Sequence, residues 1–244
     1  MYSICKMSNI RIYIKPEEID ESVLICDKDL VNKMRNVLRF KSGQSFTVFD
    51  GKGREYCFKI SQINRRSIEI IKQSLQRSKE EPNIKVTLAF PFSREDRVDF
   101  MLQKSTELGV DSLIPFKSER SDKLNFNLKK LKRWQKIIQE AARQSERLWI
   151  PELQEPVGFE ELLKKEYNLK VAGKIDGPKV EEVLNKNAKS ILISVGPVGD
   201  FSPEEYEKLK ESNFKFINLS KNLLRVETAA VFSVGIVKYF LNES

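Results

Sequence analysis

The pattern of hydrophobic and polar positions changes period several times after about residue 82. Short apolar runs in this part of the chain predict buried strands at residues 84–90, 111–116, 169–172, 191–195 and 214–219. Apolar residues at helical spacing predict helices at residues 94–108, 128–147, 157–166, 178–187 and 223–240, with another that begins at residue 202. Buried strands that alternate with helices favour an α/β fold, in which a parallel sheet is covered by helices on both faces.

The first 75 residues show a different pattern. Residues 10–14 alternate apolar and polar side chains, and strand-like runs follow at residues 45–49, 55–63 and 67–71. Asp50 and Gly51 predict a hairpin turn, because Asp-Gly tolerates positive φ. With one short helix at residues 27–38, this pattern predicts a small β-barrel over residues 1–75.

The stretch at residues 74–83 is polar and charged and contains Pro82. It predicts an interdomain linker. The sequence therefore predicts two domains, a β-barrel at residues 1–75 and an α/β domain at residues 82–244.

Composition narrows the class of protein. Of the 244 residues, 40% are hydrophobic and 32% are charged, which is typical of a soluble globular protein. No apolar run approaches the roughly 20 residues that cross a bilayer, and the first residues lack the apolar core of a signal peptide. The cysteines Cys5, Cys26 and Cys57 are scattered, and they suit a reducing cytosol better than a disulfide framework or a metal site. We therefore expect a cytoplasmic protein with no membrane partner.

The chain contains no histidine. This excludes Ser-His-Asp and Cys-His nucleophile pairs and the usual histidine-bearing zinc sites, so we expect no metal. Acid–base chemistry must come from Asp, Glu, Lys, Tyr or the substrate itself. A reaction that needs little proton transfer from the protein is favoured, and methyl transfer from a sulfonium is one such reaction.

Basic residues are concentrated in the first third of the chain. The net charge is +8, and residues 1–80 hold 16 Lys and Arg against 10 Asp and Glu, a net of +6, whereas the remainder holds 27 against 25. A polyanionic partner that docks on the first domain would explain this imbalance. A merely basic, soluble surface is the alternative. The basic side chains that cluster around the predicted helix and turns are Lys33, Arg35, Arg39, Lys52 and Arg54.

A glycine-rich loop follows the predicted strand at residues 191–195. In Gly196-Pro197-Val198-Gly199-Asp200 the glycines allow the backbone to approach a ligand closely, although such a loop can also be only a tight turn. Ser202 and Glu205 then form a capping box, with Pro203 at the first helical position, which begins the next helix.

A second loop follows the predicted strand at residues 214–219. The polar residues Ser220-Lys221-Asn222 lead to Arg225-Val226-Glu227-Thr228, where arginine, carboxylate and hydroxyl crowd the start of an apolar helix. Arg225 and Glu227 are either reactive groups or a simple ion pair at the helix start.

The two loop motifs, GPVGDFS at residues 196–202 and LLRVETA at residues 223–229, resemble those of the RsmE-type rRNA methyltransferases of the SPOUT (α/β-knot) superfamily. That family carries a GPEGGFS-like loop and an ILRxETA-like helix start. The segments QKSTELGVDSLIPFKSERS and KMRNVLRFKSG are similar to the family as well, so the resemblance covers nearly the whole chain. Two positions depart from the family pattern, because its glutamate is Val198 here and its second glycine is Asp200.

The resemblance implies a trefoil-knotted SPOUT sheet preceded by a PUA-like barrel that binds RNA, and it implies a homodimer. It also implies transfer of a methyl group from S-adenosylmethionine to N3 of a uridine in 16S (small-subunit) rRNA. Alternatives are a SPOUT methyltransferase for another RNA and, because of Val198 and Asp200, a non-catalytic RNA-binding relative.

The sequence also offers candidates for the reacting groups. Because the chain has no histidine, Arg225, with Glu227 in support, is expected to carry the chemistry by stabilising the anion that forms when uridine N3 loses its proton. Arg120 and Arg143 are expected to bind RNA as well, with plain ion pairs or a solvated helix face as the alternative. The cofactor pocket would form from three loops after strands, with the residues Ala172, Gly173, Val195, Gly196, Pro197, Gly199, Leu219, Ser220, Leu223, Leu224 and Thr228.

Overall fold

The computed structural model describes residues 10–122, 126–184 and 187–241, which form two compact units. The first unit comprises the described residues up to Glu81 together with Glu146–Trp149. The second unit comprises the described residues of Pro82–Ser145 and those from Ile150 onward. No helix in these described ranges is long and apolar enough to span a membrane.

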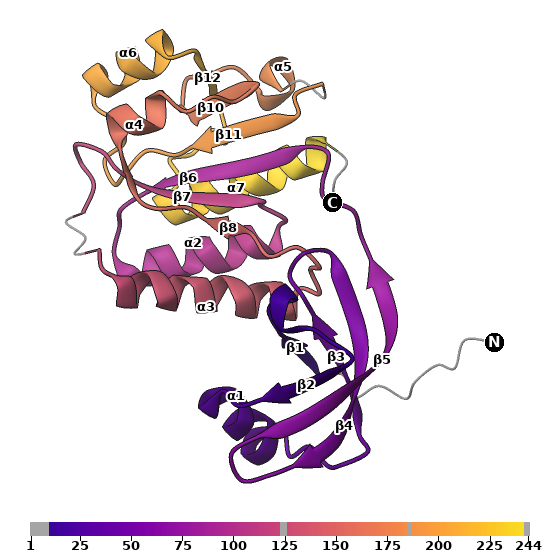
Figure 1. Cartoon of the computed structure of the whole chain (residues 1–244). Helices are drawn as coiled ribbons and strands as arrows, with labels where there is room; N and C mark the ends of the chain where they lie inside the picture. The colour runs from indigo at the N-terminus through magenta and orange to yellow at the C-terminus, as the bar shows by residue number, and fades with distance from the viewer. Residues whose placement is uncertain (1–9, 123–125, 185–186, 242–244) are drawn as a thin grey trace. The chain divides into compact units, whose positions relative to one another are not determined.

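The first unit is built on a five-stranded sheet with the spatial order β1-β3-β4-β5-β2 (Figure 1). The strands are β1 (Arg11–Tyr13), β2 (Ser22–Ile25), β3 (Ser45–Phe49), β4 (Arg54–Ile63) and β5 (Ile68–Ser78). The predicted hairpin joins β3 to β4, and Asp50 Oδ1 closes it by accepting hydrogen bonds from the backbone N–H groups of Lys52 and Arg54, at 2.7 and 2.9 Å.

Short helical segments close one side of this core. They are η1 (Pro16–Glu18), α1 (Lys28–Asn32) and the π-helical turn η2 (Lys33–Val37). Val31 and Met34 point from α1 and η2 into a cluster with Phe46, Phe58 and other inward side chains of the strands. The predicted helix at residues 27–38 is therefore two segments.

The predicted linker at residues 74–83 is wrong at its start. β5 continues to Ser78 and pairs with β4 as far as Arg54. From residue 71 onward its side chains are mostly exposed and polar, so the strand carries no hydrophobic pattern there. Backbone hydrogen bonds to β4 hold it instead, and these do not depend on side-chain polarity.

Four residues from much later in the chain complete the first unit. The backbone N–H of Gly53 donates to Leu148 O at 3.0 Å, and the indole Nε1 of Trp149 donates to Lys79 O at 3.0 Å. Nothing in the apolar pattern of the sequence marks this short segment as part of the first unit.

A buried carboxylate lies beside this segment. Glu55 is 5% exposed and forms ion pairs with Arg11 at 2.5 Å and with Arg77 at 2.8 Å. Arg11 also donates to Arg147 O at 2.6 Å, and burial lowers the pKa of its guanidinium. A buried charge is costly without partners, so the loss of any one of these side chains would leave the charge of another uncompensated.

The second unit is built on a parallel sheet with the spatial order β12-β10-β11-β6-β7-β8. All of its recorded strand pairs are parallel. The strands are β6 (Lys85–Pro91), β7 (Ser112–Lys117), β8 (Glu152–Leu153), β10 (Leu169–Gly173), β11 (Ser190–Ser194) and β12 (Phe214–Ile217), and β9 (Val157–Gly158) pairs with the end of β7.

Helices cover both faces of this sheet (Figure 1). On one face lie α2 (Glu95–Glu107), α3 (Leu128–Gln144) and α7 (Val226–Phe240), with the short α5 (Val180–Val183) in the same hydrophobic cluster. On the other face lie α4 (Phe159–Leu163) and α6 (Pro203–Glu211). The predicted α/β fold with a covered parallel sheet is confirmed. The helix predicted at residues 178–187 is only the single turn of α5, and its residues 185–186 lie outside the described part of the chain.

One buried ion pair fixes the end of α7 to the sheet. Lys238 is 4% exposed, and its Nζ donates to Asp111 Oδ2 at 2.7 Å. The same oxygen accepts a hydrogen bond from Val86 N at 2.8 Å, so one carboxylate joins α7 to β6 and to the residue before β7. A lysine in the last turn of a helix also suits the helix dipole.

Two glycines of the first unit allow a matched test of the packing around Trp149. Gly53 and Gly43 both have positive φ, but a Cβ on Gly53 would overlap Lys79 O, whereas a Cβ on Gly43 would meet nothing within 4 Å. We expect Gly43→Ala to lower the free energy of unfolding by about 1–2 kcal/mol through backbone strain alone. Gly53→Ala should cost roughly a further 1–3 kcal/mol through crowding. Urea unfolding of both variants measures the difference, and equal losses would contradict the close packing at Gly53.

Candidate functional site

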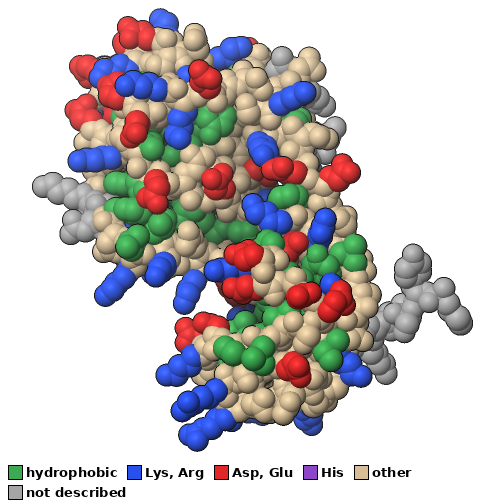
Figure 2. Space-filling view, viewed as in Figure 1, with side chains coloured by type: hydrophobic (Ala, Val, Ile, Leu, Met, Phe, Trp, Pro, Cys, Tyr) green, Lys and Arg blue, Asp and Glu red, His purple; other side chains and the backbone are tan. Residues whose placement is uncertain are grey.

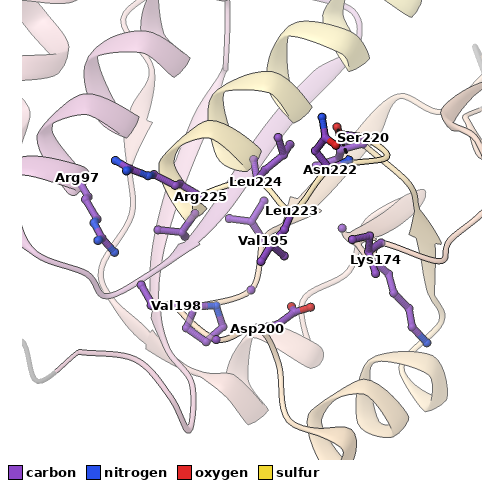
Figure 3. Close-up of a pocket in the computed structure, with 18 residues that line it drawn as sticks. Arg97, Lys174, Val195, Val198, Asp200, Ser220, Asn222, Leu223, Leu224 and Arg225 are labelled. Atoms are coloured by element: carbon purple, nitrogen blue, oxygen red, sulfur yellow. Dashed lines mark hydrogen bonds between the residues drawn. The ribbon is translucent and has the colours of Figure 1, made fainter.

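Three loops meet at the carboxyl edge of the second sheet (Figure 3). β10 lies between β11 and β12, and all three strands are parallel, so the loops that follow them leave the sheet on the same edge. These loops, which begin at Gly173, Val195 and Asn218, enclose a cavity of about 620 Å³ together with the first residues of α7.

The loop after β11 contains a tight turn. Asp200 N donates to Pro197 O at 2.9 Å, and Gly199, at the third position of this turn, has a φ of 85°. A type II turn requires positive φ at this position, which explains the glycine. A Cβ on Gly199 would meet no protein atom within 4 Å, so the backbone conformation rather than crowding within the chain demands glycine here.

Asp200 holds this loop in place. It has a φ of 63°, in the left-handed region that aspartate tolerates better than most residues. Its Oδ1 accepts from Phe201 N at 2.9 Å, and its Oδ2 accepts from the Tyr206 hydroxyl at 2.8 Å. A Cβ on Gly196 would overlap Asp200 Oδ1, so Gly196 leaves the room that the carboxylate occupies.

Tyr206 connects this loop to its neighbours. Burial, and then the hydrogen bond to Asp200, raise the pKa of the Tyr206 hydroxyl, which therefore stays protonated as a donor. The hydroxyl also lies 3.4 Å from Gly173 O at the end of β10. Lys174 Nζ lies 4.9 Å from the centre of the Tyr206 ring, which adds a cation–π contact.

Asn218 joins the loop after β12 to the loop after β10. Its backbone N–H donates to Pro178 O at 2.8 Å, its side-chain amide donates to Ile175 O, and its Oδ1 accepts from Ser220 N at 2.8 Å. The backbone and side chain of Asn218 therefore join the two loops on this side of the cavity.

Glu205 ties a fourth loop to the same site. It is 6% exposed, its Oε2 accepts from Ser202 N at 3.1 Å, and Ser202 Oγ accepts from Glu205 N, so the predicted capping box is confirmed. The other oxygen, Oε1, accepts from Glu119 N at 2.9 Å. The next residue, Arg120, donates to Gly199 O at 2.7 Å. The loop after β7 is thus bonded to Gly199 in the loop after β11 and to Glu205 in the first turn of α6.

Two arginines line the cavity on one side (Figure 3). Arg225 is the N-cap residue of α7, and its guanidinium forms no hydrogen bond or ion pair with another described residue. Arg97 comes from α2, and its Nε lies 3.8 Å from Glu227 Oε2, an oxygen that is buried without a hydrogen-bond partner. Glu227 therefore pairs with Arg97 and not with Arg225, and it does not line the cavity.

The predicted cofactor residues are distributed as follows. Nine of them line the cavity: Gly173, Val195, Gly196, Pro197, Gly199, Leu219, Ser220, Leu223 and Leu224. Ala172 is fully buried between the sheet and the helices, and Thr228 lies in a separate apolar groove on α7. The Ala172 side chain faces the hydrophobic cluster under α4 and α6, so it is not available to a ligand in the cavity.

Sequence reasoning missed several lining residues, of which Arg97 is the most informative. It lies four residues before Met101 on the buried stripe of α2. A charged residue in an apolar stripe is a usable signal, because such a position must find a partner or face a cavity. Lys174 and Ile175 also line the cavity, and only their position after a predicted strand could have indicated this.

The predicted RNA-binding residues have different surroundings. Lys33, Arg35, Arg39, Lys52 and Arg54 are all exposed, and basic side chains gather at the end of the first unit that carries α1 (Figure 2). Arg120 and Arg143 are engaged within the second unit. Arg120 binds Gly199 O, and Arg143 binds Glu140 at 2.9 Å, a hydrogen bond that raises the pKa of its guanidinium.

Over the described ranges, no group of three or more Cys, Asp or Glu side chains is placed to hold a metal ion.

Comparison with known proteins fits both units. A family model described as an RNA methyltransferase domain matches residues 79–238, and one described as an RNA methyltransferase PUA domain matches residues 27–73. A relative from Aquifex aeolicus, named Ribosomal RNA small subunit methyltransferase E, is 33% identical over 229 residues, which cover 92% of this chain and 97% of the relative. The chain belongs to this methyltransferase family. The resemblance seen in the two loop motifs is thereby confirmed.

Other members of the family are similar to this chain in sequence and in fold. A relative of the same name from Mesomycoplasma hyopneumoniae is 35% identical over 173 residues, which cover 69% of this chain and 75% of the relative. A Ribosomal RNA small subunit methyltransferase E from Neisseria gonorrhoeae, solved with bound S-adenosyl methionine, matches the fold with a TM-score of 0.85 at 30% identity, covering 94% of this chain and 97% of that one. A putative methyltransferase from Legionella pneumophila, solved with the same cofactor, gives a TM-score of 0.86 at 27% identity, covering 95% and 97% of the two chains. The second unit is therefore the methyltransferase domain of the family and the first is its PUA-like domain.

Glu205 and Glu204 provide a matched test of the bonds between loops. The two carboxylate oxygens of Glu205 accept hydrogen bonds from the backbone N–H groups of Glu119 and Ser202. In Glu205→Gln one of these N–H groups faces an amide NH₂ and loses its acceptor, because an amide has only one acceptor oxygen. We expect a loss of about 1–3 kcal/mol in the free energy of unfolding, the usual cost of an unsatisfied buried group. Glu204→Gln, on the exposed side of the same helix turn, should change stability by no more than a few tenths of a kcal/mol, as surface substitutions do. Thermal unfolding followed by circular dichroism compares them, and equal stabilities would argue against the role of Glu205.

Proposed function

We propose that this protein transfers a methyl group from S-adenosylmethionine to N3 of a uridine in 16S (small-subunit) rRNA. The observation that carries the proposal is the cavity formed by three loops after neighbouring parallel strands, with the unpaired guanidinium of Arg225 in its wall. Its relatives are named for methylation of small-subunit rRNA, and two similar structures contain the cofactor. The proposal includes a cytoplasmic location, which an rRNA substrate supports.

The cavity suits a nucleoside-sized cofactor. Its volume of about 620 Å³ is ordinary for a small-molecule site. Val195, Leu219 and Leu224 provide apolar surface, and the backbone N–H groups of Gly196 and Gly199 donate no hydrogen bond to any described residue. These groups would hold the adenosine and methionine parts, and the bound cofactor supplies an activated methyl group on its sulfonium.

The two departures from the family loop are compatible with this role. Asp200 takes up the left-handed conformation that a glycine would adopt, and its carboxylate is occupied by Phe201 N and Tyr206. Val198 lines the cavity and is 53% exposed, and a volume of about 620 Å³ remains with valine at this position. Both observations favour a catalytic protein over a non-catalytic RNA-binding relative.

The chemistry requires the uridine to lose its N3 proton before it can attack a methyl group. With no histidine in the chain, a fixed positive charge is the available device. A cation close to the uracil oxygens stabilises the developing anion and can lower such a pKa by roughly 1–3 units. Arg225 suits this task, because its guanidinium stays charged and is not engaged by the protein. Arg97, oriented by Glu227, is a second cation on the same side of the cavity.

The first unit would bind the RNA backbone. It carries most of the excess positive charge, and Arg39 and Arg54 are exposed on it. Arg120 and Arg143 have a smaller part in this proposal than their sequence positions suggested, because both are engaged by groups of the protein.

We also infer a homodimer and, from the family resemblance, a trefoil knot in the second unit. In support of the knot, α7 follows the edge strand β12 yet packs against the central strand β6, and an experimental tracing of residues 82–244 tests it.

In support of the dimer, α2 and α7 form an apolar groove of about 560 Å³, in which Phe100 and Phe232 are 44% and 43% exposed. Exposed aromatic side chains that line an apolar groove are typical of a surface that contacts another protein chain.

Arg225→Ala should lower single-turnover methylation of 16S rRNA by roughly 10²–10³, the effect of losing one preorganised charge donor. The affinity for S-adenosylmethionine, measured by calorimetry, should change far less. Higher pH should partly restore the rate, because it ionises the uridine without assistance. Lys221→Ala, which removes a neighbouring exposed cation, is the control and should keep the wild-type rate. Wild-type turnover in Arg225→Ala would refute the assignment.

Phe232→Glu should convert the dimer to a monomer, because it places a charge in the apolar groove of α7. Sedimentation velocity measures the change. Leu128→Glu, at an equally apolar but more exposed position on α3, should leave the oligomeric state unaltered. A wild-type sedimentation profile in Phe232→Glu would show that this groove is not the dimer interface.

A further inference from the structure

A second cavity lies at the opposite edge of the same sheet. The amino ends of β10, β11 and β12, with the loops that lead into them, surround a hollow of about 780 Å³. β10 has five residues, so this edge is roughly 13–17 Å from the cofactor side at the usual rise per residue. None of the residues discussed for methyl transfer lines it.

The lining of this hollow is strongly basic. Lys164, Lys165, Lys170, Lys189 and Lys215 line it, against the single carboxylate Glu166, and we call it the lysine cleft. Residues 81–244 as a whole are close to neutral, with 27 basic against 25 acidic residues. On the face of the second unit seen in Figure 2, positive and negative side chains are interspersed. A cluster of one sign is therefore a local departure from the rest of the unit.

The floor of the lysine cleft is fixed by hydrogen bonds. Asn168 Oδ1 accepts from Lys189 N and Ser190 N, both at 3.1 Å, and Asn168 N donates to Ser190 Oγ at 3.0 Å. These bonds hold the loop before β10 against the start of β11. Lys170 Nζ donates to Leu163 O at 3.1 Å and lies 5.0 Å from the centre of the Phe214 ring.

Three of the lysines are left with uncompensated charge. Lys164, Lys189 and Lys215 are exposed, and none forms an ion pair with another described residue. By contrast, Lys208 on α6 pairs with Glu160 at 2.5 Å. Unpaired like charges around one hollow repel one another, so a polyanion that neutralises them gains both their attraction and the release of its counterions.

We propose that the lysine cleft binds the phosphodiester backbone of the rRNA substrate, away from the methylated nucleotide. The inference rests on the proposed function, since it takes an rRNA as the ligand. Lysines are point charges on flexible stems, so they can neutralise the phosphates of an extended backbone without a fixed bidentate geometry. The cleft offers several such charges from three separate segments and no deep apolar pocket, which fits an extended polyanion better than a small ligand.

The test measures binding of 16S rRNA transcribed in vitro to the full chain at several salt concentrations. The double variant Lys189→Glu/Lys215→Glu should weaken binding by roughly tenfold or more and reduce the slope of log affinity against log salt by about 1.4–1.8, the loss expected for two phosphate contacts. The affinity for S-adenosylmethionine and the thermal unfolding profile should stay at wild-type values, because neither side chain contributes to the core or to the first cavity.

Two comparisons separate the possible failures. Lys129→Glu/Lys132→Glu makes the same charge change at exposed positions of α3, and an equal loss of affinity there would show a net-charge effect and overturn the assignment. Arg39→Glu reports on the RNA surface of the first unit. If it weakens binding while the cleft variant binds like the wild type, the cleft proposal alone is wrong. If neither variant weakens binding, the proposed rRNA-binding role of the first unit fails together with the cleft.

Discussion

The parallel pairing of β10 between β11 and β12 is the constraint on which the candidate site depends. Val171 is in register with Ile193 on one side and with Lys215 on the other, so the three strands end at nearly the same level. The loops that follow these strands therefore meet at the carboxyl edge of the sheet. The side chains of Asn218, Tyr206 and Glu205 then bond neighbouring loops together, and their partners are mostly backbone atoms. Main-chain atoms therefore contribute much of the shape of the cavity, and Arg97 and Arg225 bring two cationic side chains to one side of it.

Much of this could be predicted from the sequence because the second unit obeys local rules. The run at residues 191–195 is apolar throughout, as a strand covered on both faces must be, and the glycines and proline directly after it indicate a loop at a strand end. Ser202, Pro203 and Glu205 specify a helix start by position alone. Loop residues next to such strands were therefore found, including most of those that line the cavity.

What the sequence did not reveal depends on contacts between distant segments. β5 continues past residue 71 because β4 supplies hydrogen bonds, and no side-chain pattern records that pairing. Arg97 stands out as a charge beside the buried residues of α2, but only the fold brings Glu227 of α7 next to it. The five lysines of the lysine cleft are spread between residues 164 and 215, so only the sheet brings them together. In each case a local pattern is consistent with the structure but does not determine it.

The inclusion of Glu146–Trp149 in the first unit has a consequence for synthesis of the chain. More than sixty residues separate Glu81 from this segment, which at roughly 5–20 residues per second amounts to a delay of roughly 3–13 s. During that interval the Gly53 amide has no Leu148 carbonyl to bind, and the buried Arg11 guanidinium lacks the carbonyl of Arg147. The nascent N-terminal unit thus remains incomplete while residues 82–145 of the second unit are translated. Its last stabilising contacts can form only after the ribosome has made residues 146–149.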